Sequence, residues 1–68
     1  MPRLYSSRHI IAVLLVHGFS EVSQKGSHRK FRCDDKIVIV PHPKPEIPVG
    51  TFFSILRQSG LKRHDFEG

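Results

Sequence analysis

Residues 25–41 read KGSHRKFRCDDKIVIVP, the stretch with the clearest structural pattern in the chain. Within residues 28–33, side chains alternate between two faces, as they do in a strand with one face toward solvent. The face toward solvent takes His28, Lys30 and Arg32, and the opposite face takes Arg29, Phe31 and Cys33. Two aspartates follow as turn residues, and the β-branched run from Ile37 to Val40 indicates the most buried strand. The stretch therefore predicts two antiparallel strands.

Helix and turn signals precede this hairpin. Ser6 and Ser7 are both good N-caps for a helix that runs to about His17, and Gly18 supplies the left-handed residue that ends it. Residues 19–24 are mostly polar and predict a further strand, which a turn at residues 25–27 joins to the hairpin.

A proline-rich loop and a second helix follow it. Four of the five prolines lie within residues 41–48, which indicates a stiff loop. A helix is expected from Pro48 or Gly50 to Ser59, ended by Gly60. Its apolar stripe consists of Phe52, Ile55 and Leu56. Residues 61–66 are expected to form a last turn that returns Leu61 and Phe66 to the core.

The predicted order is α-β-β-β-α, an α+β fold in which two helices cover one face of a three-stranded antiparallel sheet. We expect residues 1–68 to form a single domain, with residues 1–5 as a short N-terminal tail. A chain of this length has room for one small core, which excludes large catalytic scaffolds such as barrels or kinases.

Composition and charge restrict the class of partner. Eleven Lys and Arg against six Asp and Glu give a net charge of +5, which suits nucleic acid, an acidic protein or an anionic surface. The single cysteine, Cys33, excludes a disulfide framework and a cysteine zinc site, and it favours a reducing cytoplasm. The apolar run from Ile10 to Val16 is too short to span a membrane, so we expect no membrane partner.

The turn around Gly26, Ser27 and His28 carries the most chemistry. Glycine lets the backbone turn tightly, and an imidazole can take and give protons near neutral pH. Basic neighbours attract phosphate, and together these groups suit RNA cleavage by attack of a 2′-hydroxyl on the adjacent phosphate. The basic neighbours are Lys25, Arg29, Lys30 and Arg32.

The remaining histidines have weaker signals. His42 follows the third predicted strand and is either a second acid or phosphate ligand near His28, or a plain loop residue. His17 suits a structural role at a helix C-terminus, and His9 and His64 are interpreted as surface residues. No histidine pair has zinc-site spacing, so we expect no metal and no cofactor.

Several motifs, in this order, make the chain resemble the HicA (YcfA-like) family, the messenger-RNA-cleaving toxins of HicA–HicB toxin–antitoxin pairs. The resemblance covers nearly the whole chain. The residues that carry it are Gly18-Phe19, Gln24-Lys25-Gly26-Ser27-His28, Phe31, Val38-Ile39-Val40-Pro41-His42, Glu46-Ile47-Pro48-Val49-Gly50-Thr51, Ile55-Leu56-Arg57-Gln58-Ser59-Gly60-Leu61 and Phe66.

The resemblance implies a fold like that of double-stranded-RNA-binding domains. It also implies an endoribonuclease, an mRNA interferase of the stress response, with His28 as the catalytic residue. From the residues themselves we expect metal-independent cleavage, with RNA bound by Lys25, Gly26, Ser27, Arg29, Lys30 and Arg32. The implied partners are mRNA and an inhibitory HicB antitoxin, with a heterotetramer as one candidate assembly, in a bacterial or archaeal cytoplasm.

Two departures limit the analogy. Phe53 stands where such chains commonly have a polar residue, and it either extends an apolar patch or packs under the proline-rich loop. The start of the second helix lacks the lysines with which double-stranded-RNA-binding domains hold phosphates. Two alternatives therefore stay open, a non-catalytic RNA-binding module and a partner-stabilised interaction domain.

Overall fold

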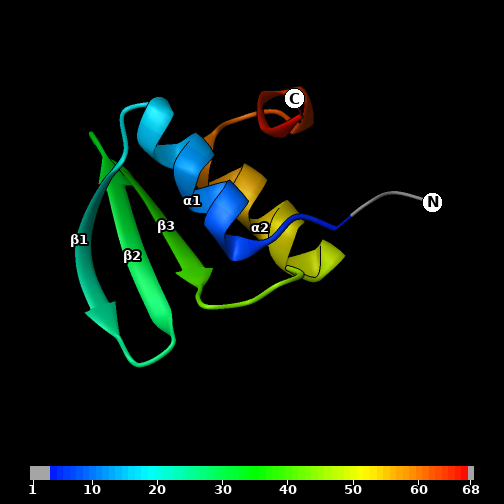
Figure 1. Ribbon diagram of the computed structural model, residues 1–68. Coiled ribbons are helices and arrows are strands. Elements are labelled where there is room, and N and C mark those ends of the chain that lie inside the picture. Colours follow the sequence, from blue (N-terminus) through cyan, green and yellow to red (C-terminus); the bar gives the residue numbers. More distant parts are fainter. Residues whose placement is uncertain (1–3, 68) are drawn as a thin grey trace.

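Two helices lie on one face of a three-stranded antiparallel sheet in the computed structural model, which describes residues 4–67 (Figure 1). The strand order is β1-β2-β3, so β2 is central, and the other face of the sheet is left open. This arrangement confirms the predicted α-β-β-β-α fold. The elements are α1 (Ser7–Val16), β1 (Ser20–Lys25), β2 (His28–Cys33), β3 (Lys36–Pro41), α2 (Val49–Ser59) and the short 3-10 helix η1 (Arg63–Phe66).

Helix α1 begins and ends as its sequence predicts. The Ser6 hydroxyl accepts a hydrogen bond from the His9 N–H at 3.1 Å and caps the N-terminus. At the other end Gly18 has a φ of +92°, and the Phe19 N–H donates to the Leu14 carbonyl at 3.0 Å. This bond satisfies a carbonyl of the last turn and directs the chain from the helix into β1.

The core lies between the sheet and the helices. It consists of Ile10, Leu14, Phe19, Phe31, Val38, Val40, Ile47, Ile55 and Phe66. On β2, Phe31 is buried in this core while Lys30 and Arg32 are exposed, which confirms the predicted alternation.

Strand β3 is the most buried of the three strands, as predicted, but its apolar run is fully buried on one face only. Only Val38 and Val40 are fully buried in this strand, whereas Ile37 is 39% exposed and Ile39 is half-buried. The sequence did not predict this difference in burial, because a continuous run of apolar residues shows no alternation between two faces. The strand is also an edge strand, and Gln58 of α2 covers part of that edge by accepting the Ile39 N–H at 3.1 Å.

Both chain ends that the structure describes pack against the domain. Residues 1–3 of the expected tail lie outside the described residues, but Tyr5 is half-buried, and its carbonyl accepts the Ile47 N–H at 2.7 Å. Its ring packs against Phe52 and Phe66 with centroid distances of 5.3 and 6.3 Å. Tyr5 therefore packs against the domain, at the position where the tail was expected to end. At the C-terminal end Phe66 is fully buried, as predicted.

No helix within residues 4–67 is long and apolar enough to cross a membrane.

Candidate functional site

The turn that carries His28 joins β1 to β2 through two residues, Gly26 and Ser27. Gly26 has a φ of +59°, and nothing lies within 4 Å of the position where a Cβ atom would stand. Glycine is therefore favoured here by backbone conformation, since space is available for a side chain. Lys25 belongs to β1 and not to the turn, which is one residue shorter than predicted.

His28 is the first residue of β2 and is exposed. In the sheet register it lies opposite Lys25 on one side and Pro41 on the other. The histidine side chains with hydrogen bonds or ion pairs within residues 4–67 are His9, His42 and His64, so the His28 imidazole is free to meet a ligand.

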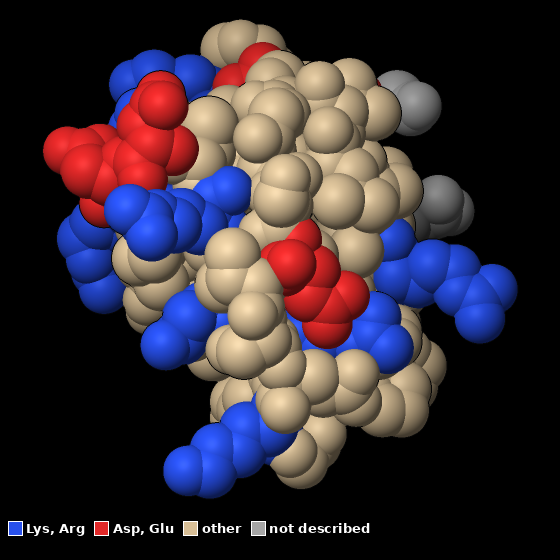
Figure 2. All heavy atoms as spheres, turned by 90° about the vertical axis from the view of Figure 1, so that its left-hand side faces the viewer, with Lys and Arg blue, Asp and Glu red and all other residues tan. Residues whose placement is uncertain are grey.

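The open face of the sheet brings three predicted RNA-binding residues to His28. Side chains two residues apart on a strand share a face, so Lys30 and Arg32 lie in line with His28 along β2. Lys25 joins them as the cross-strand partner of His28. Ser23, Lys25, His28, Lys30 and Ile39 are among the residues that line a shallow depression on this face. Figure 2 views the molecule from the side of β1 and shows Lys and Arg side chains spread over this surface, with acidic side chains between them.

Arg29 and Arg32 are less free than their charge suggests. Arg29 alternates to the other face of β2, where its Nε lies 3.6 Å from a carboxylate oxygen of Glu21 and has no hydrogen-bond partner. Its positive charge is therefore partly offset by the carboxylate. On the open face, the Arg32 Nε donates to the Asp34 carbonyl at 2.9 Å, which directs part of the guanidinium toward the β2–β3 turn.

His42 is joined through its backbone to the turn before His28, while its side chain points elsewhere. Its N–H donates to the Ser27 carbonyl at 2.7 Å. The half-buried ring makes a 2.7 Å hydrogen bond between Nδ1 and the hydroxyl of Ser7. In the strand period His42 follows Val38 and Val40, which face the helices. The structure therefore places the His42 side chain toward the helices and the His28 side chain toward the open face.

Ser7 is a residue that the sequence assigned to capping alone. It is 1% exposed, and its hydroxyl accepts the Lys44 N–H at 2.9 Å in addition to its bond with His42. Its own N–H donates to the Lys44 carbonyl at 2.9 Å. These bonds join the start of α1 to the proline-rich loop.

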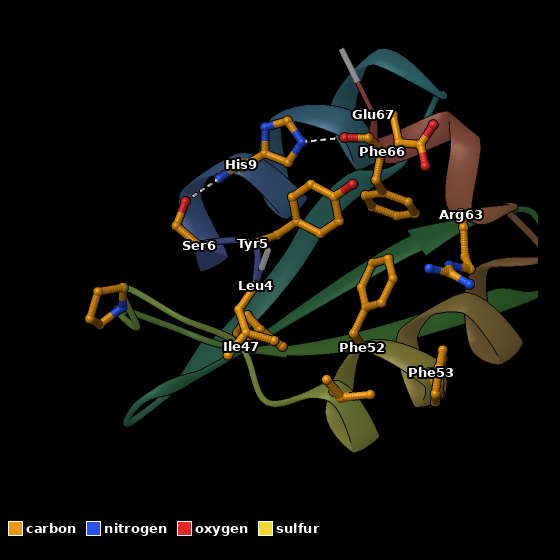
Figure 3. Close-up of a pocket in the computed structure, with 12 residues that line it drawn as sticks. Leu4, Tyr5, Ser6, His9, Ile47, Phe52, Phe53, Arg63, Phe66 and Glu67 are labelled. Atoms are coloured by element: carbon orange, nitrogen blue, oxygen red, sulfur yellow. Dashed lines mark hydrogen bonds between the residues drawn. The ribbon is translucent and has the colours of Figure 1, made fainter. Parts of the chain in front are cut away.

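A second surface feature lies on the helix side of the molecule, far from the open face of the sheet. It is an apolar groove whose aromatic walls are Tyr5, Phe52, Phe53 and Phe66, with Arg63 and Glu67 also lining it (Figure 3). Phe53 is 48% exposed, so of the two sequence interpretations the structure shows the one with an exposed ring. The sequence did not predict this groove, because its walls come from segments far apart in the chain.

The interpretation of His9 as a surface residue was wrong. Its ring is half-buried, stacks on Tyr5 with centroids 4.9 Å apart, and its Nε2 lies 2.6 Å from the Phe66 carbonyl (Figure 3). Since a carbonyl oxygen only accepts, Nε2 carries the proton in this bond. The partner is 57 positions away in sequence, so no local pattern could have indicated it.

The other candidates have structural or peripheral positions. His17 is the exposed C-cap of α1, and the His64 side chain is 75% exposed, as expected. Cys33 is a free thiol that packs partly buried against the core. No group of three or more His, Cys, Asp or Glu residues that could hold a metal ion occurs in the described part of the chain.

The geometry defines a basic, open surface with an accessible imidazole at the end of its central row. Cations on such a surface can bind phosphates, and the imidazole can exchange a proton with a group held there. The start of α2 contributes nothing comparable, because its first turn holds Val49, Gly50 and Thr51 and no cation.

Comparison with known families gives an independent result. Residues 7–61 of the 68 match the family described as the HicA toxin of bacterial toxin–antitoxin systems. The match begins at the first residue of α1 and ends just after α2, so it includes the whole sheet and the turn before His28. Comparison with curated proteins finds no significant match. Because the family match covers most of the chain, this protein belongs to the HicA toxin family, the toxin components of toxin–antitoxin systems.

Proposed function

We propose that this toxin is a metal-independent endoribonuclease that cleaves mRNA in the cytoplasm, with His28 as its catalytic residue. The observation that carries the proposal is the exposed His28 imidazole beside Lys25 and Lys30 on the open face of the sheet. The family implies a toxin with an antitoxin partner, and RNA cleavage is a direct way for a small basic protein to stop translation.

The proposed reaction is an internal transfer of the phosphodiester. The His28 imidazole takes the proton of a ribose 2′-hydroxyl as the oxygen attacks the adjacent phosphorus. The bond from phosphorus to the 5′-oxygen breaks, and that oxygen leaves with a proton from solvent. His28 then returns its proton to solvent. The products are a 2′,3′-cyclic phosphate and a 5′-hydroxyl, and no metal or other reactant is required.

The cations have a defined role in this reaction. Negative charge builds on the phosphate oxygens in the transition state, and a fixed positive group nearby stabilises it. Lys25 and Lys30 flank His28 on the open face, and in this proposal they supply the positive charge, while Arg32 holds an adjacent phosphate of the RNA. Gly26 and Ser27 hold the turn, and we propose that their backbone lies against the RNA.

The test compares His28→Ala with the parent in induced cells and in a purified cleavage assay. His64→Ala is the matched control, because His64 is an exposed histidine outside the sheet. We expect growth arrest and RNA cleavage with the parent and with His64→Ala, and neither with folded His28→Ala. Cleavage by folded His28→Ala at the parent rate contradicts the catalytic assignment.

One observation favours a second function, RNA binding without cleavage. General acid–base catalysis commonly uses two groups, and His28 has no titratable hydrogen-bond partner among the described residues. This alternative predicts salt-sensitive RNA binding with intact RNA after long incubation with the parent protein. Detection of a 2′,3′-cyclic phosphate end excludes it.

The toxin family also implies binding to an antitoxin protein. A chain with net charge +5 suits a partner that is acidic at the contact. We propose that a HicB-type antitoxin inhibits the toxin by covering the open face around His28. Addition of the antitoxin should then abolish RNA binding and cleavage together.

A further inference from the structure

Three kinds of side chain form parallel rows on the open face of the sheet. The rows follow from the register, in which His28 lies opposite Pro41, Lys30 opposite Ile39 and Arg32 opposite Ile37. Directly opposite residues share a face, so each member of the central row has an apolar neighbour on β3. We call Ile37, Ile39 and Pro41 the apolar row. On the other side, Ser23 lies opposite Lys30 and Ser20 opposite Arg32.

The apolar row is not explained by the packing of this domain. Both helices lie on the other face of the sheet, where Val38 and Val40 meet the core. Ile37 is 39% exposed, and Ile39 and Pro41 are half-buried at the surface. Ile39 also lines the depression that contains His28, Lys25 and Lys30, so apolar and cationic groups surround the same space.

We propose that the apolar row is a platform for the nucleobases of a single RNA strand whose phosphates lie along Lys30 and Arg32. The inference rests on the proposed RNA function and deepens it by naming the form of RNA that the face accepts. We call His28, Lys30 and Arg32 the cationic row. When the phosphates lie along this row, the bases extend either toward β1 or toward β3, and the side over β3 is the apolar one. Flat bases lose water on contact with isoleucine and proline side chains, which favours binding.

The spacing of the rows fits an extended strand of RNA. Residues on one face of a strand repeat at about 6.6 Å, because each residue advances about 3.3 Å. Successive phosphates of a stretched single strand are separated by a comparable distance, so one nucleotide corresponds to two residues of β2 and β3. Three nucleotides then span His28 with Pro41, Lys30 with Ile39, and Arg32 with Ile37.

The same geometry disfavours a duplex on this face. In a double helix the bases are paired and turned away from the backbone surface, so the apolar row could not touch them. The helix side offers no cations in the first turn of α2 for duplex phosphates. Single-stranded RNA is therefore the form that uses both rows at once.

The experiment measures binding of short RNA to protein that does not cut it. Three proteins that all carry His28→Ala are compared for their affinity for a uridine hexamer: one with the apolar row unaltered, one with Ile37→Thr and one with Ile39→Thr. Threonine keeps the branched shape that suits a strand while removing apolar surface. Val49→Thr is the matched control, because Val49 is 44% exposed and lies on α2, away from the sheet. Thermal unfolding confirms that each variant is folded.

A second probe separates bases from phosphates. The same hexamer with abasic riboses keeps every phosphate and lacks every base. We expect the abasic strand to bind more weakly than the uridine strand by about fivefold for each base on the platform, the lower end of the range for stacking on aromatic rings. Ile37→Thr and Ile39→Thr should each weaken binding of the uridine hexamer by a similar factor and leave binding of the abasic hexamer unchanged. Val49→Thr should change the affinity for neither hexamer.

Each outcome decides the proposal. The platform is overturned if the protein binds the uridine hexamer and the abasic hexamer with equal affinity. It is also overturned if the isoleucine substitutions weaken the binding of both hexamers equally. The apolar row would then be a surface for a protein partner. If the folded His28→Ala protein with the unaltered apolar row binds neither the uridine nor the abasic hexamer, both the platform and the RNA function are overturned. If the parent does not cleave RNA but the base-dependent loss occurs, the platform stands and the catalytic proposal alone fails.

Discussion

The backbone N–H of His42 donates to the carbonyl of Ser27 at 2.7 Å, one residue before His28. The bond extends the pairing of β3 with β2 past the last paired residues, His28 and Pro41. His42 is in turn held by its ring to Ser7 at the start of α1. The position of the turn therefore depends on a chain of contacts that crosses the domain from the helix layer to the sheet.

The first prediction concerns this chain of contacts. Ser7→Ala removes the acceptor of the Lys44 N–H and the hydroxyl partner of His42, at a position that is 1% exposed. Leaving buried polar groups unpaired costs about 1–3 kcal/mol in the free energy of unfolding. Urea denaturation followed by circular dichroism measures this loss. Ser23→Ala, at an exposed position of β1, should change stability by less than about 0.5 kcal/mol, and equal effects of the two substitutions would contradict the role of Ser7.

The second prediction contrasts two residues of β2. His28→Ala should leave the free energy of unfolding within about 0.5 kcal/mol of the parent, because the side chain is exposed. Phe31→Ala empties a fully buried site and should cost about 3–5 kcal/mol, enough to unfold much of a domain this small. Thermal unfolding of both variants tests the contrast. A large loss of stability in His28→Ala would show that its effect on toxicity cannot be assigned to catalysis.

The third prediction concerns Gly26, whose φ is +59°. Alanine at this position should destabilise the hairpin by about 1–2 kcal/mol, since residues with a side chain disfavour the left-handed backbone conformation. Asparagine tolerates it better and should cost less. Because nothing stands within 4 Å of the added Cβ atom, the difference reports backbone conformation and not a clash. Chemical denaturation measures it, and an alanine variant as stable as the asparagine variant would rule out strain at this turn.

Local sequence signals predicted the fold because its helix ends and turns depend on particular residue types. Gly18, Gly26 and Gly60 all adopt positive φ where the sequence predicted a helix end or a turn. The alternation within β2 assigned Phe31 to the core and Lys30 to solvent, and both positions are confirmed.

Contacts between distant segments could not be predicted from local sequence patterns. The ring of His9 reaches the Phe66 carbonyl across 57 positions, and Ser7 reaches His42 across 35. Charge alone did not distinguish Arg29 from its neighbours among the expected RNA ligands, whereas the structure places Arg29 beside Glu21. Arg29 and Lys30 are consecutive in β2 and point to opposite faces, so the two occupy different electrostatic surroundings.

That difference gives the last prediction, on the salt dependence of RNA binding. Each phosphate neutralised on a single strand contributes about −0.7 to the slope of log K against log salt concentration. Lys30→Ala should make the slope shallower by about that amount, because Lys30 lies on the open face in line with His28. Arg29→Ala should leave the slope unchanged, since Arg29 lies on the other face, 3.6 Å from the Glu21 carboxylate. Fluorescence anisotropy over a salt series in the His28→Ala background gives both slopes. A shallower slope for Arg29→Ala would show that RNA draws this arginine away from Glu21, and the binding surface would then extend around the sheet toward the helices.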